Sequence, residues 1–390
     1  MKSLTNQSFM KLIICLALPV ALLSISCKKP AEPLKPVEGL KDSFKDKFLM
    51  GVALNKAQIL GRDTLVHAFT VQHFNSITAE NEMKWERIHP QPDVYDFTVP
   101  DSLIAFGERN GMFIVGHTLV WHSQVPDWVF TDEKGKPLTR DALLQRMKDH
   151  IYAVVGRYKG KVDGWDVVNE ALDEDGQLRK SRWHEIIGDD YIQKAFEFTR
   201  EADPGAELYY NDYNIELKKK REGAVRLLQE LQQKGIKIDG VGIQGHWHLH
   251  SPDLQEIDSS LQAYGQLGLK VMITELDVNV IPEPSGIIGA DVAQRADYQS
   301  QLNPWPESFP DSMQQVLASR YAELFGLFLK HSDKVSRVTF WGIHDGYSWK
   351  NNWPIPGRTT YPLLFDRNYQ PKPAYDAVIE LTKIQPEASN

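Results

Sequence analysis

Cysteine is almost absent from this sequence, and the two that occur lie close to its N-terminus. Cys15 and Cys27 are the only cysteines among 390 residues. No disulfide framework can therefore tie the rest of the sequence together. Its stability must come from side-chain packing.

An excess of basic residues is also missing. The chain has 44 lysines and arginines against 52 aspartates and glutamates, which gives a formal net charge of −8. A nucleic-acid partner would favour a basic face, so this balance argues against one. Hydrophobic residues make up 42% and charged residues 25% of the chain, which is ordinary for a soluble globular protein of one large domain or two smaller ones.

The N-terminal residues do not have the pattern of a folded domain. Lys2 and Lys11 precede an apolar run at residues 12–23, which fits the core of a signal peptide and is short for a membrane-spanning helix. The small residues that follow lead to Cys27, so the segment resembles a bacterial lipoprotein signal, in which Cys27 is lipidated and becomes the first mature residue. The alternative is an ordinary cleaved signal with an incidental cysteine.

These features divide the chain into three parts. Residues 1–26 are predicted to be a signal peptide of the lipoprotein type, and residues 27–39, which contain three prolines, an extended tether. Residues 40–390 are predicted to form the folded domain. We expect an exported outer-membrane lipoprotein that faces the periplasm or the cell surface. We also expect it to be a monomer that meets the membrane only through its lipid anchor.

Strand-like and helix-like segments alternate from residue 40 onward. The predicted strands are residues 48–53, 75–79, 112–119, 162–169, 207–210, 240–244, 270–275 and 337–341. The predicted helices include residues 56–69, 101–109, 143–158, 183–202, 215–234, 311–330 and 373–381. Strand-then-helix units without a hairpin signal between them indicate a single α/β domain, a (β/α)8 TIM barrel. The long loop after strand seven, residues 280–310, either lines a substrate site or is a tolerated insertion.

Two predicted strands end in a carboxylate. Residues 165–171 run from an apolar stretch into Asn169 and Glu170, and residues 271–277 do the same at Glu275. A buried strand with a polar C-terminal tip is how an α/β barrel presents catalytic groups. Two such carboxylates suggest paired acid/base or nucleophilic chemistry. Each glutamate considered alone could instead be a solvated charge at a strand end.

The other side chains expected at the strand ends are mostly amides, carboxylates, imidazoles, ammonium groups and indoles. They are Glu80, Asn81, Lys84, His117, Trp121, His122, Asn169, Tyr213, Gln244, His246, His248, His250, Asp277, Trp341 and Trp349. Polar groups of these kinds hydrogen-bond hydroxyls, and indole faces stack on sugar rings, so the set suits a carbohydrate. Any one tryptophan could instead belong to the core, and Lys84 could be a surface charge.

The alternating histidines His246, His248 and His250 have two interpretations. In an extended strand they would share one face, which is a pattern that can bind a metal. Alternatively, His246 lies between Glu275 and Asp277 on the next strand and keeps both carboxylates ionised. A metal site would need further histidine or aspartate ligands from other strands.

Motifs in several parts of the chain together resemble the family-ten glycoside hydrolases, the endo-1,4-β-xylanases. They are residues 77–85, 116–122, 165–171, 211–214, 243–246, 273–277 and 341–342. The resemblance covers about residues 40–383 and places a motif on nearly every strand, in the family's order. It implies that residues 40–390 form a catalytic barrel that cuts internal linkages of xylan with retention of configuration, without a cofactor or a metal.

The resemblance also implies a role for each site residue. Glu170 is the general acid/base and Glu275 the nucleophile, with Asp277 in a supporting role. Glu80, Asn81 and Lys84 hold the sugar on the non-reducing side of the cut. His117, Asn169, Gln244 and His246 hydrogen-bond the reacting sugar, Trp121, Trp341 and Trp349 form its aromatic walls, and Tyr213 falls near the nucleophile. Residues 343–346 depart from the pattern of many members, which bears on subsite preference.

Two rival functions remain open from the sequence. One is a metal-dependent hydrolase built on the histidines at 246–250, for which sensitivity to chelators would argue. The other is a lipoprotein that binds polysaccharide without cutting it. Both candidate glutamates are present, which counts against a pure binding role.

Overall fold

Parallel strands form the centre of the structure, a computed structural model that describes residues 37–284, 290–297 and 299–383. The predicted signal peptide, Cys27 and most of the predicted tether lie outside the described residues. None of the helices in the described ranges has both the length and the apolarity needed to cross a bilayer.

The strands close into a barrel. They are β1 (Leu49–Leu54), β2 (Ser76–Ala79), β3 (Phe113–Trp121), β4 (Gly164–Asn169), β5 (Glu207–Asp212), β6 (Gly240–Ile243), β7 (His246–His248), β8 (Lys270–Asn279) and β9 (Val335–Phe340). Neighbours pair in parallel from β1 to β6, then β6 with β8, β8 with β9 and β9 with β1. The short β7 pairs only with β8, beyond the end of β6. The (β/α)8 prediction is confirmed.

The barrel strands are buried along almost their whole length. Every residue of β4 is buried, and on β8 only the first residue is exposed. Parallel strands in an α/β barrel are covered by helices on one face and by the barrel interior on the other, so both faces need apolar side chains. This requirement is why the strands could be recognised in the sequence as continuous apolar runs.

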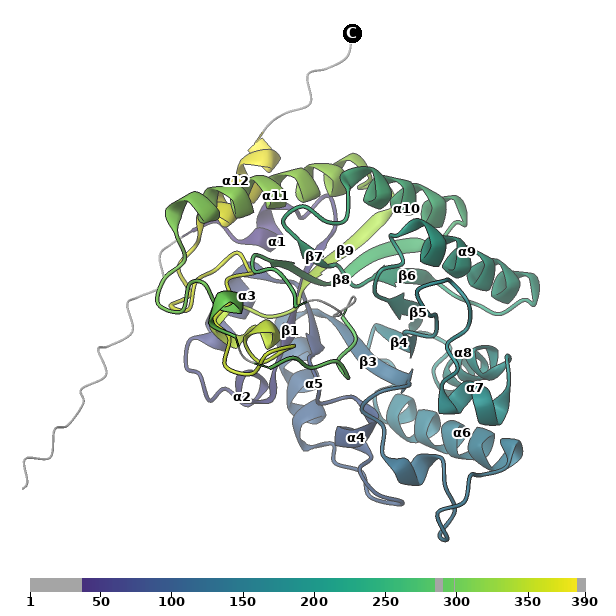
Figure 1. The fold of residues 1–390 in the computed structure, drawn as a ribbon. Helices are drawn as coiled ribbons and strands as arrows, with labels where there is room; N and C mark the ends of the chain where they lie inside the picture. The colour runs from purple at the N-terminus through teal and green to yellow at the C-terminus, as the bar shows by residue number, and fades with distance from the viewer. Residues whose placement is uncertain (1–36, 285–289, 298, 384–390) are drawn as a thin grey trace, which may run out of the picture. The chain divides into compact units, whose positions relative to one another are not determined.

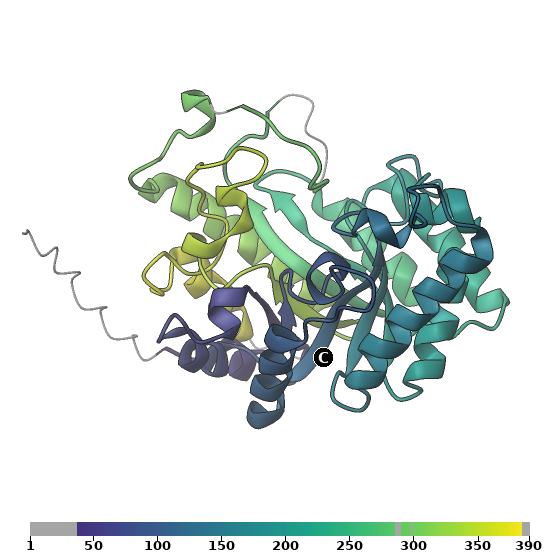
Figure 2. The same cartoon turned by 90° about the horizontal axis from the view of Figure 1, so that it is seen from below.

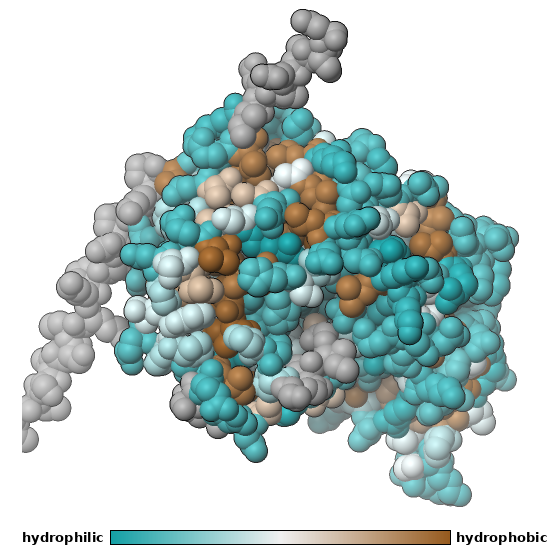
Figure 3. Space-filling model, turned by 45° about the horizontal axis from the view of Figure 1, so that its top comes forward, coloured by the Kyte–Doolittle hydropathy of each residue, from teal (hydrophilic) through white to brown (hydrophobic). Residues whose placement is uncertain are grey.

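Helices cover the outside of the barrel (Figure 1). They are α1 (Leu40–Ser43), α2 (Lys56–Ile59), α3 (Val66–His73), α4 (Trp85–Ile88), α5 (Thr98–Asn110), α6 (Arg140–Arg157), α7 (Arg182–Ile187), α8 (Tyr191–Ala202), α9 (Lys218–Gln233), α10 (Leu254–Gln266), α11 (Asp311–Lys330) and α12 (Pro373–Lys383). Short 3-10 turns occur at η1 (Asp127–Val129), η2 (Ser300–Leu302), η3 (Asp345–Tyr347) and η4 (Trp349–Asn351). The face in Figure 3 is mainly hydrophilic, with small hydrophobic areas between hydrophilic ones.

Two helices predicted as continuous are each broken in two. Residues 56–69 contain all of α2 and the first half of α3, and residues 183–202 contain nearly all of α7 and all of α8. The breaks contain Gly61, with φ +64°, and Gly188, with φ +100° and ψ −173°. The latter conformation is open essentially only to glycine. The apolar periodicity continues across both breaks, so the pattern alone did not reveal them.

The predicted sixth strand, residues 240–244, corresponds to β6 and does not continue into the histidine segment. It ends at Ile243, and Gly245, with φ +82°, turns the chain before β7 begins at His246. The extended run from residue 244 to residue 250 that would align three histidines is therefore absent. His250 lies in a bend after β7.

The barrel interior changes from apolar to polar along its axis. Near the N-terminal ends of the strands, Val115, Tyr209 and Met272 pack together, and the guanidinium of Arg337 lies 5.3 Å from the Tyr209 ring centroid. Near the C-terminal ends, amides, carboxylates and imidazoles replace these side chains. In Figure 2 the green connection after β8 lies beyond the arrowhead end of the strands, beside this polar end.

Candidate active site

A pocket opens at the C-terminal ends of the strands. It is lined by Glu80, Asn81, Lys84, His117, Trp121, Gln124, Asn169, Glu170, Gln244, His246, Glu275, Ala290, Val292, Trp341 and Trp349. The set includes both candidate carboxylates and every predicted sugar-contacting residue except Tyr213. Sequence positions about two hundred and sixty residues apart meet here because parallel strands of a closed barrel present their ends at one mouth.

Glu275 is held on β8 by a histidine between two carboxylates. His246 Nε2 lies 3.1 Å from Glu275 Oε2, and its Nδ1 lies 3.0 Å from Asp277 Oδ2. Burial disfavours the imidazolium, but Asp277 and Glu275 together raise the pKa of His246 to about 9. Burial alone would raise the pKa of Glu275. The hydrogen bond from His246 and the nearby positive charges, Lys84 among them, outweigh it, and the pKa lies below its usual value.

Glu170 follows β4 and has different neighbours. Trp121 Nε1 donates a hydrogen bond to Oε2 at 2.8 Å, and Gln244 Nε2 donates to Oε1 at 2.9 Å. Burial raises the pKa of Glu170, and the charge of Glu275 adds to the rise, while the two donors oppose it. His122 Nδ1 lies 4.0 Å from Oε2, and burial lowers the pKa of His122 to about 4, so this imidazole is neutral near pH 7.

Amide side chains join the two carboxylates. Asn211 Nδ2 donates to Glu275 Oε1 at 2.8 Å and to Asn169 Oδ1 at 2.9 Å, and Asn169 Nδ2 donates to Glu170 Oε1 at 3.2 Å. Thr274 Oγ1 donates to Asn211 Oδ1 at 2.6 Å, which fixes the orientation of that amide. The chain of hydrogen bonds holds both carboxylates in one fixed arrangement at the pocket floor.

A second polar group lies on the β2 side of the pocket. Lys84 Nζ donates to Asn81 Oδ1 and to Gln124 Oε1, both at 2.9 Å. Burial lowers the pKa of Lys84 and raises the pKa of Glu80, each partly offset by the other's charge. An ammonium group has three N–H donors, so Lys84 retains one for a ligand hydroxyl. Its Nζ also lies 4.8 Å from the centroid of the Trp121 ring.

Aromatic and imidazole rings form another part of the pocket lining. His117 Nδ1 lies 2.9 Å from Asp166 Oδ2, which leaves Nε2 available to the pocket. Trp341 packs edge-on against His117, with ring centroids 5.3 Å apart. Trp349 Nε1 donates to Asp277 Oδ2 at 2.7 Å. Asp277 therefore fixes both His246 and this tryptophan without lining the pocket itself.

The comparisons with known proteins agree with this geometry. The sequence model of the family described as Glycosyl hydrolase family 10 matches residues 39–381. The chain belongs to glycosyl hydrolase family 10. Endo-1,4-beta-xylanase A of Xylanibacter ruminicola is 47% identical over 343 residues, which are 88% of this chain and 93% of that protein. Beta-1,4-xylanase of Dictyoglomus thermophilum is 40% identical over 377 residues, 96% of this chain and 99% of that protein.

Solved structures show the same relationship. A GH10 endoxylanase retrieved from a sugarcane soil metagenome has 44% sequence identity and a TM-score of 0.86, with 88% of this chain and 100% of that chain covered. A xylanase XynB from Paenibacillus barcinonensis, in complex with a conduramine derivative, has 36% identity and a TM-score of 0.79, covering 88% and 98%. The predicted enzyme class, a glycoside hydrolase of the endo-1,4-β-xylanase family, is confirmed.

Tyr213 is the predicted site residue that the structure places elsewhere in this family 10 enzyme. Its hydroxyl accepts a hydrogen bond from Arg179 Nη2 at 3.0 Å, and Lys220 Nζ lies 3.7 Å from its ring centroid. Among the described residues, no hydrogen bond joins it to Glu275. Tyr213 lies on the Glu170 side, where the charge of Glu170 contributes to the rise in its pKa that burial begins.

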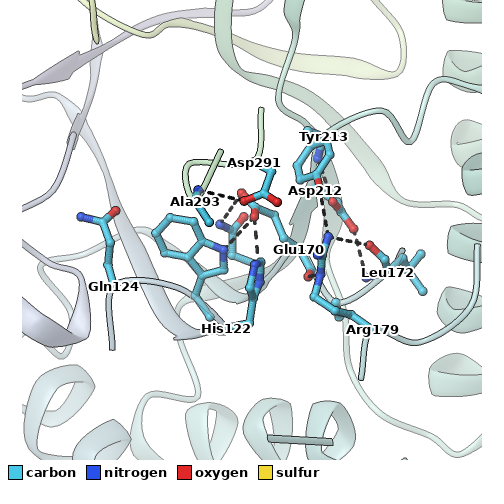
Figure 4. A network of polar contacts seen from close by, with 12 residues as sticks. His122, Gln124, Glu170, Leu172, Arg179, Asp212, Tyr213, Asp291 and Ala293 are labelled. Carbon is cyan, nitrogen blue, oxygen red and sulfur yellow. Dashed lines mark hydrogen bonds and ion pairs between the residues drawn. The ribbon is translucent and has the colours of Figure 1, made fainter. Parts of the chain in front are cut away.

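The loop after β8 contributes to the pocket of this family 10 enzyme. Ala290 and Val292 line the pocket, so of the two interpretations of residues 280–310 the structure favours the substrate-lining one. Figure 4 shows Asp291 and His122 near the carboxylate of Glu170, with Arg179 on the side of its backbone. The unusual stretch at residues 343–346 has a structural role, because Asp345 forms a buried ion pair with Lys372 at 2.8 Å.

Sequence reasoning missed several residues of the site. Asn211 and Gln124 bond site residues directly, Asp166 orients His117, and Arg179 bonds the backbone of Glu170. Asn211 could have been predicted, because it is the first polar residue after an apolar strand. The same pattern led to the prediction of Asn169. Nothing in the local pattern marked the other three.

The histidines at 246, 248 and 250 do not form the shared face that an extended strand would give them. Both ring nitrogens of His246 are engaged with carboxylates, and burial lowers the pKa of His248, which does not line the pocket. Within the described ranges, no group of three or more histidine, cysteine, aspartate or glutamate side chains is arranged to hold a metal ion.

Proposed function

We propose that this enzyme is an endo-acting, retaining β-1,4-xylanase that works by double displacement. The observation that carries the proposal is a buried pair of carboxylates, Glu170 and Glu275, whose pKa values move in opposite directions within one pocket. One group is thereby suited to carry a proton and the other to carry charge, which is the division of labour that glycoside hydrolysis needs.

In the first step, an ionised Glu275 oxygen attacks the anomeric carbon while Glu170 protonates the departing glycosidic oxygen. The C–O bond to the leaving sugar breaks and a covalent xylosyl-enzyme ester forms. His246 keeps Glu275 ionised and fixes its rotamer by the 3.1 Å contact. Since Oε1 of Glu275 is bonded to Asn211 and Oε2 to His246, both oxygens have defined positions before substrate arrives.

In the second step, Glu170 acts as a base. Formation of the ester removes the negative charge of Glu275, and with it the repulsion that helped to keep Glu170 protonated. Glu170 then takes a proton from water as the water attacks the anomeric carbon, the bond from that carbon to Glu275 breaks, and Glu275 leaves as a carboxylate. Two inversions at one carbon give net retention.

The other pocket residues support substrate binding. Lys84, Asn81 and Glu80 present donors and acceptors to the hydroxyls of the sugar on the non-reducing side, and Asn169 is placed to bond the 2-hydroxyl of the reacting sugar. Trp341 and Trp349 supply the walls that would exclude a hydroxymethyl group and so favour xylose over glucose. The names of the relatives support xylan as substrate and internal cleavage.

The mechanism is tested by paired azide trapping. Glu275→Ala and Glu170→Ala are incubated with an activated aryl β-xylobioside and azide. We expect an α-xylobiosyl azide from Glu275→Ala, by direct attack, and a β-azide from Glu170→Ala, by attack on the covalent intermediate. Glu207→Ala, at the opposite end of the barrel, should behave as wild type. Near-normal turnover of Glu275→Ala without azide would contradict the assignment of the nucleophile.

Substrate class and mode of cleavage are tested separately. Reducing-sugar release is measured on xylan, arabinoxylan, cellulose and mannan, together with the loss of viscosity of xylan. An endo-acting xylanase lowers viscosity long before it releases much reducing sugar. Preferential release of xylose from chain ends, or activity mainly on cellulose, would contradict the proposal.

We also propose that the enzyme is exported and anchored by lipid at Cys27. The support is the sequence pattern at residues 1–27, with its basic start, apolar run and small residues before the cysteine. Radiolabelled palmitate should be incorporated into the wild-type protein and not into Cys27→Ser. The variant should be released from membranes by a wash that leaves wild type bound. Equal labelling of both would contradict lipidation at this residue.

A further inference from the structure

The backbone at Glu170 adopts a conformation that residues with a side chain rarely take. Its φ is +56°, in the left-handed region. The regular strand ends one residue earlier, at Asn169. A left-handed residue other than glycine is unfavourable by itself and persists when its surroundings hold it there. The contacts of residues 170–172 therefore bear on where the Glu170 carboxyl points.

Arg179 supplies three of these contacts, two from its side chain and one from its backbone amide, and its side chain also bonds Tyr213. Its Nε donates to the carbonyl of Glu170 at 3.0 Å, and its Nη2 donates to the carbonyl of Leu172 at 3.1 Å and to the hydroxyl of Tyr213 at 3.0 Å. Its own amide donates to the carbonyl of Ala171 at 2.8 Å. The carbonyls of residues 170, 171 and 172 therefore all accept hydrogen bonds from Arg179. Figure 4 shows those that its side chain donates.

A buried ion pair between Lys220 and Asp212 holds Leu172 and Tyr213, the residues that Arg179 also contacts. Lys220 Nζ lies 3.0 Å from Asp212 Oδ1, and both side chains are fully buried. Asp212 Oδ2 accepts a hydrogen bond from the amide of Leu172 at 3.4 Å. Because Lys220 also lies against the ring of Tyr213, the tyrosine that orients Arg179 is itself held in place. The bend after β4 is thereby held by carboxylate and guanidinium side chains from two other segments.

We propose that Arg179 is a positioning residue that sets the direction of the Glu170 carboxyl through the backbone of residues 170–172. The inference rests on the proposed function, which assigns Glu170 as the acid/base. Arg179 does not line the pocket and acts without touching substrate. A small displacement of a proton donor lowers the rate of the steps that need the proton. Glu275 is held by His246 and Asn211, and Arg179 hydrogen-bonds neither of them, so the attack by Glu275 depends less on this bend.

Comparison of two substrates tests the inference. Arg179→Met removes all three side-chain hydrogen bonds, and Arg179→Lys retains a charge with different geometry. We expect kcat/KM on xylotetraose to fall about 10- to 100-fold for Arg179→Met and less for Arg179→Lys. On 2,4-dinitrophenyl β-xylobioside, whose leaving group needs no protonation, kcat/KM should change by no more than about threefold, because that parameter reports the first step.

A matched control is available in another loop. Arg146 likewise donates to three backbone carbonyls, those of Trp128, Val129 and Thr131, but it does not contact residues 170–172. Arg146→Met should change kcat/KM on both substrates by the same factor. Covalent trapping of Glu275 by 2,4-dinitrophenyl 2-deoxy-2-fluoro-β-xylobioside, followed by mass spectrometry, reports in each variant whether the nucleophile is in place.

The possible outcomes separate the inference from the proposed function. An equal loss on both substrates by the Arg179 variants, with trapping slowed to match, would mean that Arg179 only stabilises the fold and would overturn the inference. Unchanged kcat/KM on xylotetraose would overturn it as well. The proposed function fails instead if wild type does not hydrolyse xylotetraose, or if Glu170→Ala retains that activity, whatever the Arg179 variants do.

Discussion

Glu170 and Glu275 face the same pocket, yet each is supported by a different kind of neighbour. Glu275 lies within β8 and is held by a charged histidine that a second carboxylate supports. Glu170 lies just after a strand on a left-handed backbone and receives its hydrogen bonds from the neutral donors Trp121, Gln244 and Asn169. The charged support lowers the pKa of Glu275, whereas burial raises the pKa of Glu170 by more than its neutral donors lower it.

The difference shows how one residue type acquires two roles. Burial is the largest influence on both carboxyls and raises both pKa values. At Glu275 alone, the hydrogen bond from His246 and the surrounding positive charges reverse the direction. The division of roles therefore depends on His246 and Asp277 more than on either glutamate. It can be tested by disturbing each side separately.

The largest effect is expected from shortening each carboxylate by one methylene. Glu275→Asp moves the nucleophile away from a carbon that it must bond, and kcat/KM on xylotetraose should fall at least about 1,000-fold. Glu170→Asp should lose about 100-fold, because a proton can still be passed through a water molecule. Steady-state kinetics on xylotetraose measures both. Equal losses would show that activity is equally sensitive to the position of the two carboxylates. They would contradict the expected difference between Glu275 and Glu170.

A smaller effect is expected when the charged support is weakened. In Asp277→Asn, His246 loses the neighbour that contributes most to its raised pKa of about 9. A neutral His246 no longer lowers the pKa of Glu275, which should therefore rise. Since Glu275 must be ionised to attack, the acid limb of the pH profile of kcat/KM should move to higher pH. Activity near pH 5 should fall about tenfold, because one pH unit changes the ionised fraction by that factor.

The measurement for Asp277→Asn is a full pH profile of kcat/KM beside that of wild type. Asp166→Asn is an informative comparison, because Asp166 supports His117 rather than His246. Its acid limb should move less. An unchanged acid limb in Asp277→Asn would mean that Asp277 serves only to hold the side chains of His246 and Trp349 in place.

The barrel and most of the pocket could be predicted because parallel strands have a strong signal. Each is an apolar run that ends in a polar residue, and alternate residues share a face, so the contact of His246 with Glu275 and Asp277 followed from neighbouring strands. The breaks at Gly61 and Gly188 were missed because apolar periodicity continues through them. A glycine in a helical pattern is compatible with both a continuous helix and a break.

The missed residues share a physical reason. Arg179 lies in an irregular segment nine positions after Glu170, and its contacts are with carbonyls, which every residue carries. Gln124 and Asp166 act on other side chains, Lys84 and His117, rather than on a ligand. A side chain that performs chemistry can be recognised in the sequence by its residue type. A side chain that only orients another one is recognised only when the three-dimensional structure shows the contact. Tyr213 was predicted near the nucleophile by resemblance alone and lies on the other side.

The smallest effect is expected when one neutral donor is removed from Glu170. Trp121→Phe keeps an aromatic face and loses the 2.8 Å hydrogen bond from Nε1. That bond opposes the rise in the pKa of Glu170, so its loss raises the pKa further. Because Glu170 must be protonated in the first step, the basic limb of kcat/KM should move to higher pH by about half a unit, with a rate loss of about two- to fivefold. Asp277→Asn thus narrows the active pH range from the acid side and Trp121→Phe widens it on the basic side. A shift of the acid limb in Trp121→Phe would show that the two supports are not independent.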